Sequence, residues 1–184
     1  LEAANGENIT VTKDGSAVKL NGATNVVTAN IVASNGVIHV IDRVLIPPTV
    51  LPIVGTVVAP AYFNKNFTTL VAAVEAASAD ILTTLLNADQ KTVFAPTNDA
   101  FIAAGITDLP DEATLNAVLS YHVVAGRVTA AELPSGSAAV STLGGDFYLS
   151  NNGADGVFIN GTTEVVATDI LATNGVVHVI DRVL

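Results

Sequence analysis

One apolar pattern occurs twice in this chain, at residues 35–45 and again at residues 174–184, with a single Ile-to-Val exchange between the copies. Each copy opens with Asn-Gly, which predicts a tight turn, and continues with β-branched residues, which predict a strand buried on both faces. In the second copy His178 alternates with Val176 and Ile180, so it shares a face with apolar side chains. We therefore expect His178 to be a core histidine.

The repetition extends upstream of this strand, because residues 20–22 correspond to residues 159–161 at the same offset. We interpret residues 1–48 as the C-terminal portion of one repeat and residues 49–184 as a complete domain. Three prolines between positions 47 and 52 interrupt any regular element, so a short and stiff connection is expected there.

A helical period replaces the strand period after residue 65. The expected elements are helices over 67–77 and 80–86, a strand over 92–95, a helix capped by Thr97 or Asn98, a helix from residues 110–112 to Tyr121-His122, a helical turn at 129–132, and strands from there to residue 184. Helices segregated from a largely antiparallel set of strands indicate an α+β fold, a β-sandwich flanked by several α-helices.

Composition narrows the function. The formal charge is −10 with seven Lys and Arg residues, which would repel a phosphate backbone, so we expect no nucleic-acid partner. Half of the residues are apolar, but polar residues and Gly interrupt every run well short of the ~20 residues that cross a membrane, so no membrane insertion is expected. The absence of Cys leaves the compartment open, and any targeting segment was removed or never belonged to this piece.

Candidate catalytic and metal-binding residues are few. The chain has three His and no Gly-x-Ser-x-Gly motif, so we expect no enzyme. We expect His178 and His122 to be buried, with hydroxyls such as those of Thr92 or Thr97 as hydrogen-bond partners. The acidic residues are dispersed, and residues 151–156 favour a hairpin turn over a metal loop, so neither a metal nor another cofactor is expected.

Three separated stretches carry a family resemblance: residues 92–101 (TVFAPTNDAF), Tyr121-His122, and residues 174–184. In this order and spacing they resemble the first conserved box, the Tyr-His pair and the second conserved box of the fasciclin (FAS1) domain family. The resemblance covers about residues 51–184 as one complete domain and residues 1–48 as the C-terminal portion of a preceding one. The residues to which it assigns structural roles are Thr92, Phe94, Pro96, Thr97, Asn98, His178 and Asp181.

The resemblance implies a secreted or cell-surface adhesion module that contacts a cell-surface or matrix protein or a glycan, without catalysis. In some animal members an Asp-Ile pair and the Tyr-His region serve integrin binding, and the matching positions here are Asp169-Ile170 and Tyr121-His122. The first copy has Asn30-Ile31 instead and lacks the acid. Because the aliphatic residue is present in both copies, we expect Ile170 to matter for packing more than for recognition.

The chain contains one helical half, about residues 55–135, but two β halves, residues 5–45 and 147–184. We expect the second β half to complete the domain, because it follows the helical half in the usual family order, although a circular permutation would use the first. Residues 1–48 would then expose the apolar strand 37–45 and either belong to a repeat completed elsewhere or pair with a neighbouring copy. Homo-association gives an alternative function, a structural repeat unit that self-associates into a surface fibre or biofilm matrix.

Overall fold

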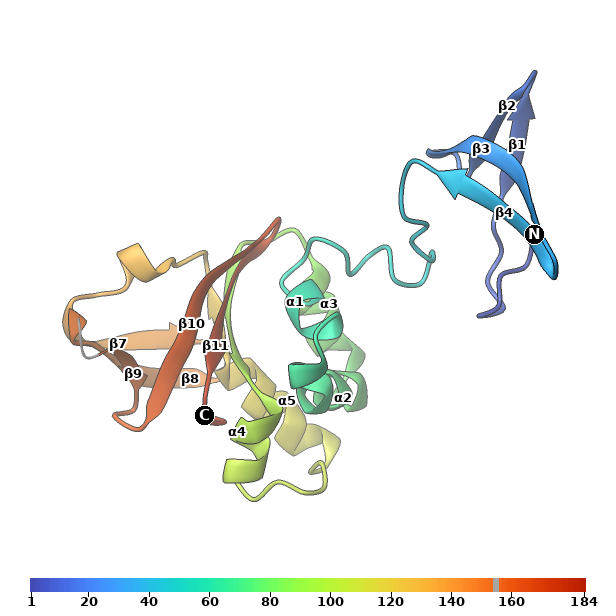
Figure 1. Ribbon diagram of the computed structural model, residues 1–184. Coiled ribbons are helices and arrows are strands. Elements are labelled where there is room, and N and C mark those ends of the chain that lie inside the picture. Colours follow the sequence, from blue (N-terminus) through green and yellow to red (C-terminus); the bar gives the residue numbers. More distant parts are fainter. Residues whose placement is uncertain (154–155) are drawn as a thin grey trace. The chain divides into compact units, whose positions relative to one another are not determined.

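The computed structural model describes residues 1–153 and 156–184. The chain forms two compact units, Leu1–Pro52 and Ile53–Leu184, and each unit has its own sheet (Figure 1). The division falls at the end of the proline-containing segment that the sequence indicates as a connection.

The N-terminal unit is a four-stranded antiparallel sheet in which consecutive strands are neighbours. Its strands are β1 (Val11–Asp14), β2 (Ala17–Leu20), β3 (Thr24–Ala33) and β4 (Gly36–Ile41). Asn21 and Asn30 adopt left-handed backbone conformations with φ of 48° and 60°, which Asn tolerates better than most residues. β4 is an edge strand without a fully buried residue, as the sequence suggests for this apolar segment.

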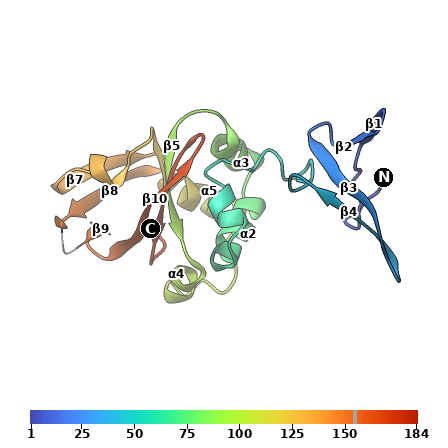
Figure 2. The ribbon, with the colours of Figure 1, turned by 45° about the horizontal axis from the view of Figure 1, so that its top comes forward.

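The C-terminal unit is built on a seven-stranded sheet with the order β6-β5-β11-β10-β9-β8-β7. Figure 2 labels β5, β7, β8, β9 and β10 of this sheet. Its strands are β5 (Lys91–Pro96), β6 (Val123–Ala125), β7 (Gly136–Thr142), β8 (Gly145–Asn151), β9 (Val157–Ile159), β10 (Thr163–Ala172) and β11 (Gly175–Ile180). Its two ends approach each other where the N–H of Leu143, just after β7, donates to the carbonyl oxygen of Val123 over 2.8 Å. The expected sandwich is therefore one sheet that curls until it is nearly closed.

Neighbouring strands in this sheet are antiparallel except β5 and β11, which run parallel from the pair Gly175 and Lys91 to the pair Ile180 and Pro96. The sequence pattern did not indicate this direction, because a buried strand shows the same apolar run in both kinds of sheet. β5 of the helical half therefore pairs with β11 of the second β half, whereas β4 of the first lies in a separate sheet.

Helices pack on one side of β5 and β11 (Figure 1). The helices are α1 (Ala59–Tyr62), the 3-10 helix η1 (Lys65–Phe67), α2 (Thr68–Ala76), α3 (Ala79–Leu86), α4 (Asn98–Ala103), α5 (Glu112–Tyr121) and the 3-10 helix η2 (Ala130–Glu132). The sequence pattern did not predict α1, since four residues that include Pro60 are too few to establish a helical period.

Side chains cap α4 and α5 close to where the sequence predicts that these helices begin. The hydroxyl of Thr97 accepts from the N–H of Ala100, so Thr97 and not Asn98 caps α4. The carboxylate of Asp111 accepts from the N–H of Thr114 over 3.1 Å and caps α5, which places Pro110 before the helix and not in its first turn. The Thr114 hydrogen bonds lower the pKa of the Asp111 carboxyl.

Two apolar cores lie on opposite faces of β11. The helical side contains Val57, Phe67, Leu70, Leu85, Ala95, Phe101, Leu119, Val123, Val177 and Val179. The interior of the curled sheet contains Phe94, Val124, Leu133, Phe147, Leu149, Ile159 and Ile180. All residues of β11 are buried, so the prediction of a strand buried on both faces is confirmed for the second copy.

The backbone of β5 lies directly against Gly175 of β11. A Cβ at this position would overlap the carbonyl oxygen of Lys91, and the φ of Gly175 is 152°. Gly36, the equivalent residue of the N-terminal unit, has nothing within 4 Å of its Cβ position. Glycine is therefore required in one copy and unconstrained by surrounding atoms in the other.

We predict that Gly175→Ala lowers the free energy of unfolding by about 3 kcal/mol, because the methyl group must push β5 away. Gly36→Ala should change it by less than about 0.5 kcal/mol, since the added atom points into open space. Urea unfolding of both variants and the parent, followed by circular dichroism, measures the difference. Equal effects of the two substitutions would contradict the role assigned to the β5 contact.

Candidate functional site

Asp169 lies at a bulge in β10, where the pairing with β11 shifts register between Ala167 and Ile170. Its backbone has φ of 60°. Two hydrogen bonds hold it: its N–H donates to Nδ1 of His178 over 3.3 Å, and its carboxylate accepts from the N–H of Ala130 over 2.8 Å. The exposed carboxylate of Asp169 therefore has a defined position on the surface.

Ile170, the next residue, points the other way. It is half-buried and packs against the core on the helical side. In the N-terminal unit the equivalent Ile31 is 43% exposed, because no helical layer covers it. The pair combines an outward carboxylate with an inward aliphatic side chain, which agrees with a packing role for Ile170.

Tyr121 ends α5 and is half-buried. Its hydroxyl donates to the carbonyl oxygen of Asp146 over 3.0 Å and accepts from the side-chain amide of Asn160 over 3.3 Å. Its ring lies edge-on to that of Phe147, with centroids 6.1 Å apart. A Cβ on Gly144 would come within 2.6 Å of the amide nitrogen of Tyr121, so only glycine fits there. These contacts tie the end of α5 to β8.

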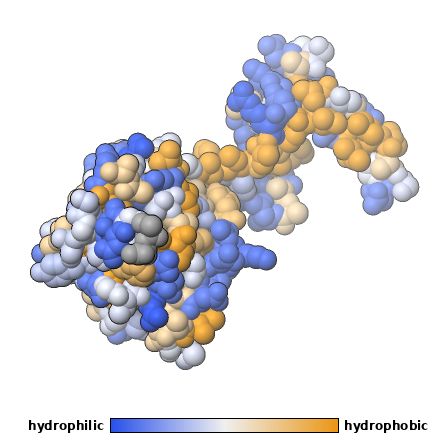
Figure 3. Space-filling view, turned by 60° about the vertical axis from the view of Figure 1, so that its left-hand side comes forward, coloured by the Kyte–Doolittle hydropathy of each residue, from blue (hydrophilic) through white to orange (hydrophobic). Residues whose placement is uncertain are grey.

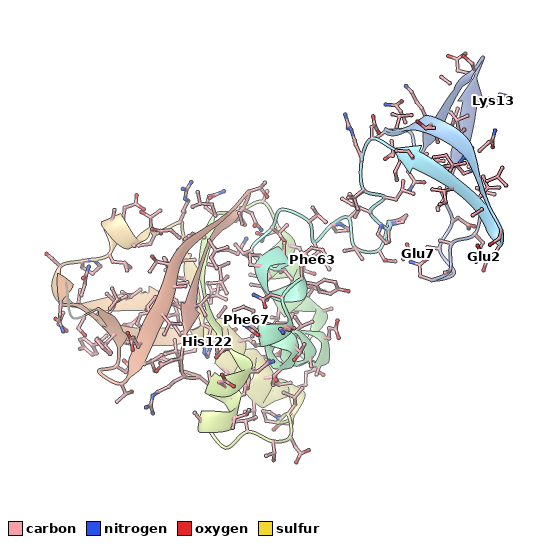
Figure 4. All side chains as sticks on the ribbon, viewed as in Figure 1. Glu2, Glu7, Lys13, Phe63, Phe67 and His122 are labelled. Carbon is pink, nitrogen blue, oxygen red and sulfur yellow. The ribbon has the colours of Figure 1, made fainter. Side chains whose placement is uncertain are left out.

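His122 is 3% exposed and lies inside the C-terminal unit (Figure 4). Its Nδ1 lies 2.7 Å from the carbonyl oxygen of Val118, and its Nε2 accepts from the N–H of Leu184 over 3.0 Å. A carbonyl oxygen only accepts, so Nδ1 carries the proton and the ring is neutral. Burial lowers the pKa of His122 from 6.5 to about 4.

His178 is fully buried in the middle of β11. Its Nδ1 accepts from the N–H of Asp169, so its Nε2 carries the proton and donates to the carbonyl oxygen of Val128 over 2.9 Å. Its ring packs against Phe94 with centroids 5.4 Å apart. The prediction that His178 and His122 are buried is confirmed.

The prediction that hydroxyls of Thr92 or Thr97 bind these histidines is wrong, because all the ring partners are backbone groups. The hydroxyl of Thr92 instead donates to the carbonyl oxygen of Gly126 over 2.9 Å and accepts from the N–H of Val128 over 2.9 Å. Thr97 serves as the cap of α4. Sequence spacing could not reveal these partners, since any backbone group in the fold can accept or donate.

The other residues of the two boxes make structural contacts as well. Phe94 and Pro96 are buried, and Phe94 also packs edge-on against Phe147 with centroids 5.3 Å apart. Asn98 accepts from the N–H of Thr69 over 3.0 Å and so connects α4 to α2. Asp181 accepts from the backbone N–H of the opposite strand, that of Glu164, over 2.7 Å.

Asn174 has a function that the sequence did not predict. It is 4% exposed, and its Oδ1 accepts from the N–H of Val57 over 2.9 Å. Its amide nitrogen donates to the carbonyl oxygens of Leu85 and Asn87 over 2.9 and 2.7 Å. Asn174 thus joins the β half to the start of the helical half and to the end of α3. The Asn-Gly repeat was the available signal, but a local turn accounts for it equally well.

An apolar cavity of about 90 Å³ lies between α1, α2, α3 and β5. Its only polar lining residues among those described are Tyr62, Glu75 and His122, and both ring nitrogens of His122 already bind backbone groups. The cavity therefore lacks the convergent polar groups that give a small-molecule site its specificity.

Within residues 1–153 and 156–184, no three His, Asp or Glu side chains gather to hold a metal ion. The hairpin predicted over residues 151–156 includes Ala154 and Asp155, which lie outside the described residues. In the described part of the chain no single helix has the length and apolarity to cross a membrane, and Lys65–Ala76 with Ala79–Leu86, bent by 119°, meet that test only as a pair.

A helical layer on one side of a nearly closed seven-stranded sheet, held by the Asn-Gly strand β11, defines an α+β domain of the FAS1 class. The chain belongs to the fasciclin family: the family model described as Fasciclin domain matches residues 1–47 and 65–184. The fold is similar to that of a FAS1 domain pair from the insect cell adhesion molecule Fasciclin I, with a TM-score of 0.59 over 96% of this chain and 66% of that chain, at 21% identity.

Relatives with similar sequences include bacterial and animal proteins. Protein sll1483 of Synechocystis sp. is 46% identical over 136 residues, which cover 70% of this chain and 72% of that protein. Periostin of Homo sapiens is 32% identical over 163 residues, and transforming growth factor-beta-induced protein ig-h3 of Sus scrofa is 36% identical over 157 residues. These matches cover 86% and 83% of this chain but 18% and 22% of the two animal proteins, so the chain spans about a fifth of their length.

The neutral state of His122 predicts a pH dependence of stability. Its folded pKa of about 4 lies below the unfolded value of 6.5, so the folded state binds fewer protons between these values. The stabilisation is complete above pH 6.5 and is lost as the pH falls toward 4, by up to about 1.4 kcal/mol per pH unit and roughly 3 kcal/mol in all. Denaturant unfolding at several pH values across this window measures the slope.

His122→Gln serves as the control, because it removes the titrating group. We expect a lower stability at neutral pH and a flatter slope between pH 6.5 and 4. A slope that stays the same in this variant would assign the effect to other groups. Protonation of the His122 imidazole near its ordinary pKa of about 6.5 in an NMR titration would contradict the effect of burial.

Proposed function

We propose that this chain is an extracellular or cell-surface adhesion module that acts by contact with a cell-surface or matrix protein or a glycan, and that it is not catalytic. The observation that carries the proposal is the exposed carboxylate of Asp169, held by hydrogen bonds to both its backbone and its side chain. A preordered group loses little entropy when a partner binds it. Membership of the fasciclin family and the likeness to a domain pair from a cell adhesion molecule support the proposal.

Exposed apolar side chains accompany this carboxylate on β10. Val166 is 52% exposed and Leu171 is 63% exposed. A partner of matching chemistry presents apolar groups around a cation or a hydrogen-bond donor, and the net charge of −10 favours a basic partner. Tyr121, half-buried, contributes at most an accessible ring edge, and we assign the buried His122 to packing.

The hydrogen bonds of the two buried histidines support a non-catalytic role of the chain. Activation of a nucleophile needs an imidazole nitrogen that is free to take a proton from it. In His122 and His178 one nitrogen donates to a carbonyl oxygen and the other accepts from a backbone N–H. Neither ring has a nitrogen left for a substrate.

We further propose that residues 1–48 are the C-terminal portion of one FAS1 repeat and that residues 49–184 are a complete domain. The two separate segments matched by the family model support this division. Repeats in tandem would strengthen adhesion by avidity without any new contact.

A second candidate function is a structural repeat unit that self-associates into a surface fibre or a biofilm matrix. The exposed edge strand β4 favours it, because unpaired strand edges are templates for other strands. The two functions differ in solution behaviour, since a fibre unit grows in size with concentration and a monomeric adhesin does not.

Asp169→Asn tests the adhesive surface. We expect binding to a responsive matrix protein, cell-surface protein or glycan to fall by about tenfold, which is about 1.4 kcal/mol, because the substitution removes the charge. The fold should persist, since Asn30 already adopts the same φ of 60° and its N–H donates to His39 over 3.2 Å. Surface plasmon resonance against an array of extracellular ligands measures the change.

Two control variants accompany this experiment. Glu164→Gln removes an exposed charge from the same strand and should leave binding unchanged. Ile170→Ala should lower the free energy of unfolding by about 2 kcal/mol, because the side chain is half-buried, and should leave binding unchanged below the melting temperature. Parent-level binding by Asp169→Asn, or an equal loss with Glu164→Gln, would contradict the assigned role of Asp169.

A further inference from the structure

Strand β4 differs from β11 only by Ile38 in place of Val177, but it lacks the neighbouring strand β5 and the helical layer that cover β11. Val37, Ile38 and Val40 are 54%, 55% and 42% exposed. Their equivalents in β11 are Val176, Val177 and Val179, and these are 0%, 2% and 8% exposed. Figure 3 shows hydrophobic surface extending along the N-terminal unit. The apolar faces and one edge of β4 are therefore open.

The N-terminal unit nevertheless has the same internal frame as β8 to β11. The strand pairings β3–β4 and β10–β11 have equivalent registers, including the bulge. Three hydrogen bonds of the N-terminal unit have equivalents in the C-terminal unit. Thr10 N–H donates to Asn21 Oδ1 (2.9 Å) as Tyr148 N–H does to Asn160 Oδ1 (3.0 Å), and Asn25 N–H donates to Asp42 Oδ1 (2.8 Å) as Glu164 N–H does to Asp181 Oδ1 (2.7 Å). Asn30 N–H donates to His39 Nδ1 (3.2 Å) as Asp169 N–H does to His178 Nδ1 (3.3 Å). β4 is therefore presented in a preformed conformation.

The C-terminal unit shows what covers a strand of this sequence. β5 pairs in parallel with the edge of β11 along its whole length, from Gly175 to Ile180. Helices cover Val177 and Val179, and Phe94 of β5 packs on His178. A strand of this sequence is thus covered by an apolar strand in parallel and by the helices that belong to the same half of the domain.

Three residues of the first copy lack the contacts that their equivalents in the second copy make with the helical half. Asn35 is exposed and has no side-chain hydrogen bond among the described residues, whereas the equivalent Asn174 binds the helical half through both its side-chain atoms. Gly36 has open space at its Cβ position, whereas Gly175 is required by β5. His39 is exposed, whereas the equivalent His178 is buried and packs on Phe94.

We propose that β4 is a docking strand for the helical half of a FAS1 domain, which adds an apolar strand of the β5 type in parallel and lays its helices over Ile38 and Val40. In the register of β11, an aromatic side chain such as that of Phe94 packs on His39, and the strand backbone passes directly against Gly36. Main-chain pairing gives affinity in such β-augmentation, and the side-chain pockets give specificity. This inference does not depend on the proposed adhesive role of Asp169.

The test adds a probe, the polypeptide of residues 53–135, to the intact 184-residue chain. The probe carries the helices and β5 but lacks β7 to β11, and in the intact chain β11 is already paired. We expect a 1:1 complex in which amide exchange of residues 36–41 slows by about a hundredfold when the probe is at 100 times its Kd. Peptides from β4 and β11 differ in mass through Ile38 and Val177, so mass spectrometry follows each strand separately.

Gly36→Ala is the decisive variant, because it keeps the apolar surface but places a methyl group where the incoming strand must pass. It should abolish the protection of β4. Val32→Lys is the matched control: Val32 is 81% exposed, and its equivalent Leu171 stays 63% exposed in the complete domain, so docking should persist. Protection that survives in Gly36→Ala would indicate non-specific apolar adsorption and would overturn the proposal.

If the separate probe aggregates, a joined chain repeats the test, with residues 53–135 placed before Leu1 through a flexible Gly/Ser linker. The linked segment then has an effective concentration near β4 in the millimolar range. The amides of residues 36–41 should then exchange as slowly as those of residues 175–180. Exchange as fast as in the original chain would overturn the proposal, as would concentration-dependent dimers of the original chain in which β4 is already protected. Neither result bears on Asp169→Asn, whose binding assay tests the adhesive role separately.

Discussion

The need to cover β11 on every side organises the C-terminal unit. Its backbone groups must be paired along both edges, which β5 and β10 accomplish, and its two faces must be kept from water. The helical layer covers one face and the far part of the curled sheet covers the other. Gly175 permits the close parallel pairing, and Asn174 fixes the helical half at the entrance of the strand. The buried histidine in the strand is accommodated because both its ring nitrogens meet backbone groups.

Much of this arrangement follows from the sequence pattern, and the features that the pattern did not predict have a common cause. The internal repeat, the cap of α4 at Thr97 and the burial of β11 depend on short-range signals or on hydrophobic periodicity. The direction of β5 relative to β11 and the bonds of Asn174 depend on contacts between distant segments. An apolar run has no preferred strand direction, and an Asn in an Asn-Gly turn shows no sign of a second set of partners. Tertiary structure alone determines those features.

The two copies of the β half separate local from tertiary effects within one chain. The left-handed conformations of Asn21 and Asn30 recur at Asn160 and Asp169, so these turns and bulges form with or without a helical layer. Burial does not recur, since it depends on what packs against the strand. The β half of this chain thus has the same local conformation in both copies, and the helical layer determines whether its apolar surface becomes a core.

The different environments of Asn35 and Asn174 also have a chemical consequence over time. In an Asn-Gly sequence the backbone nitrogen of Gly can attack the side-chain carbonyl carbon of Asn, which expels ammonia and closes a succinimide ring. Water then opens the ring to aspartate or isoaspartate. The amide of Asn174 is held by three hydrogen bonds in the core, whereas Asn35 is exposed at the end of an open hairpin. Deamidation should therefore proceed at Asn35 well before it reaches Asn174, so that stored protein gains a negative charge, and in part a rerouted backbone, at the start of β4 while the start of β11 stays chemically intact.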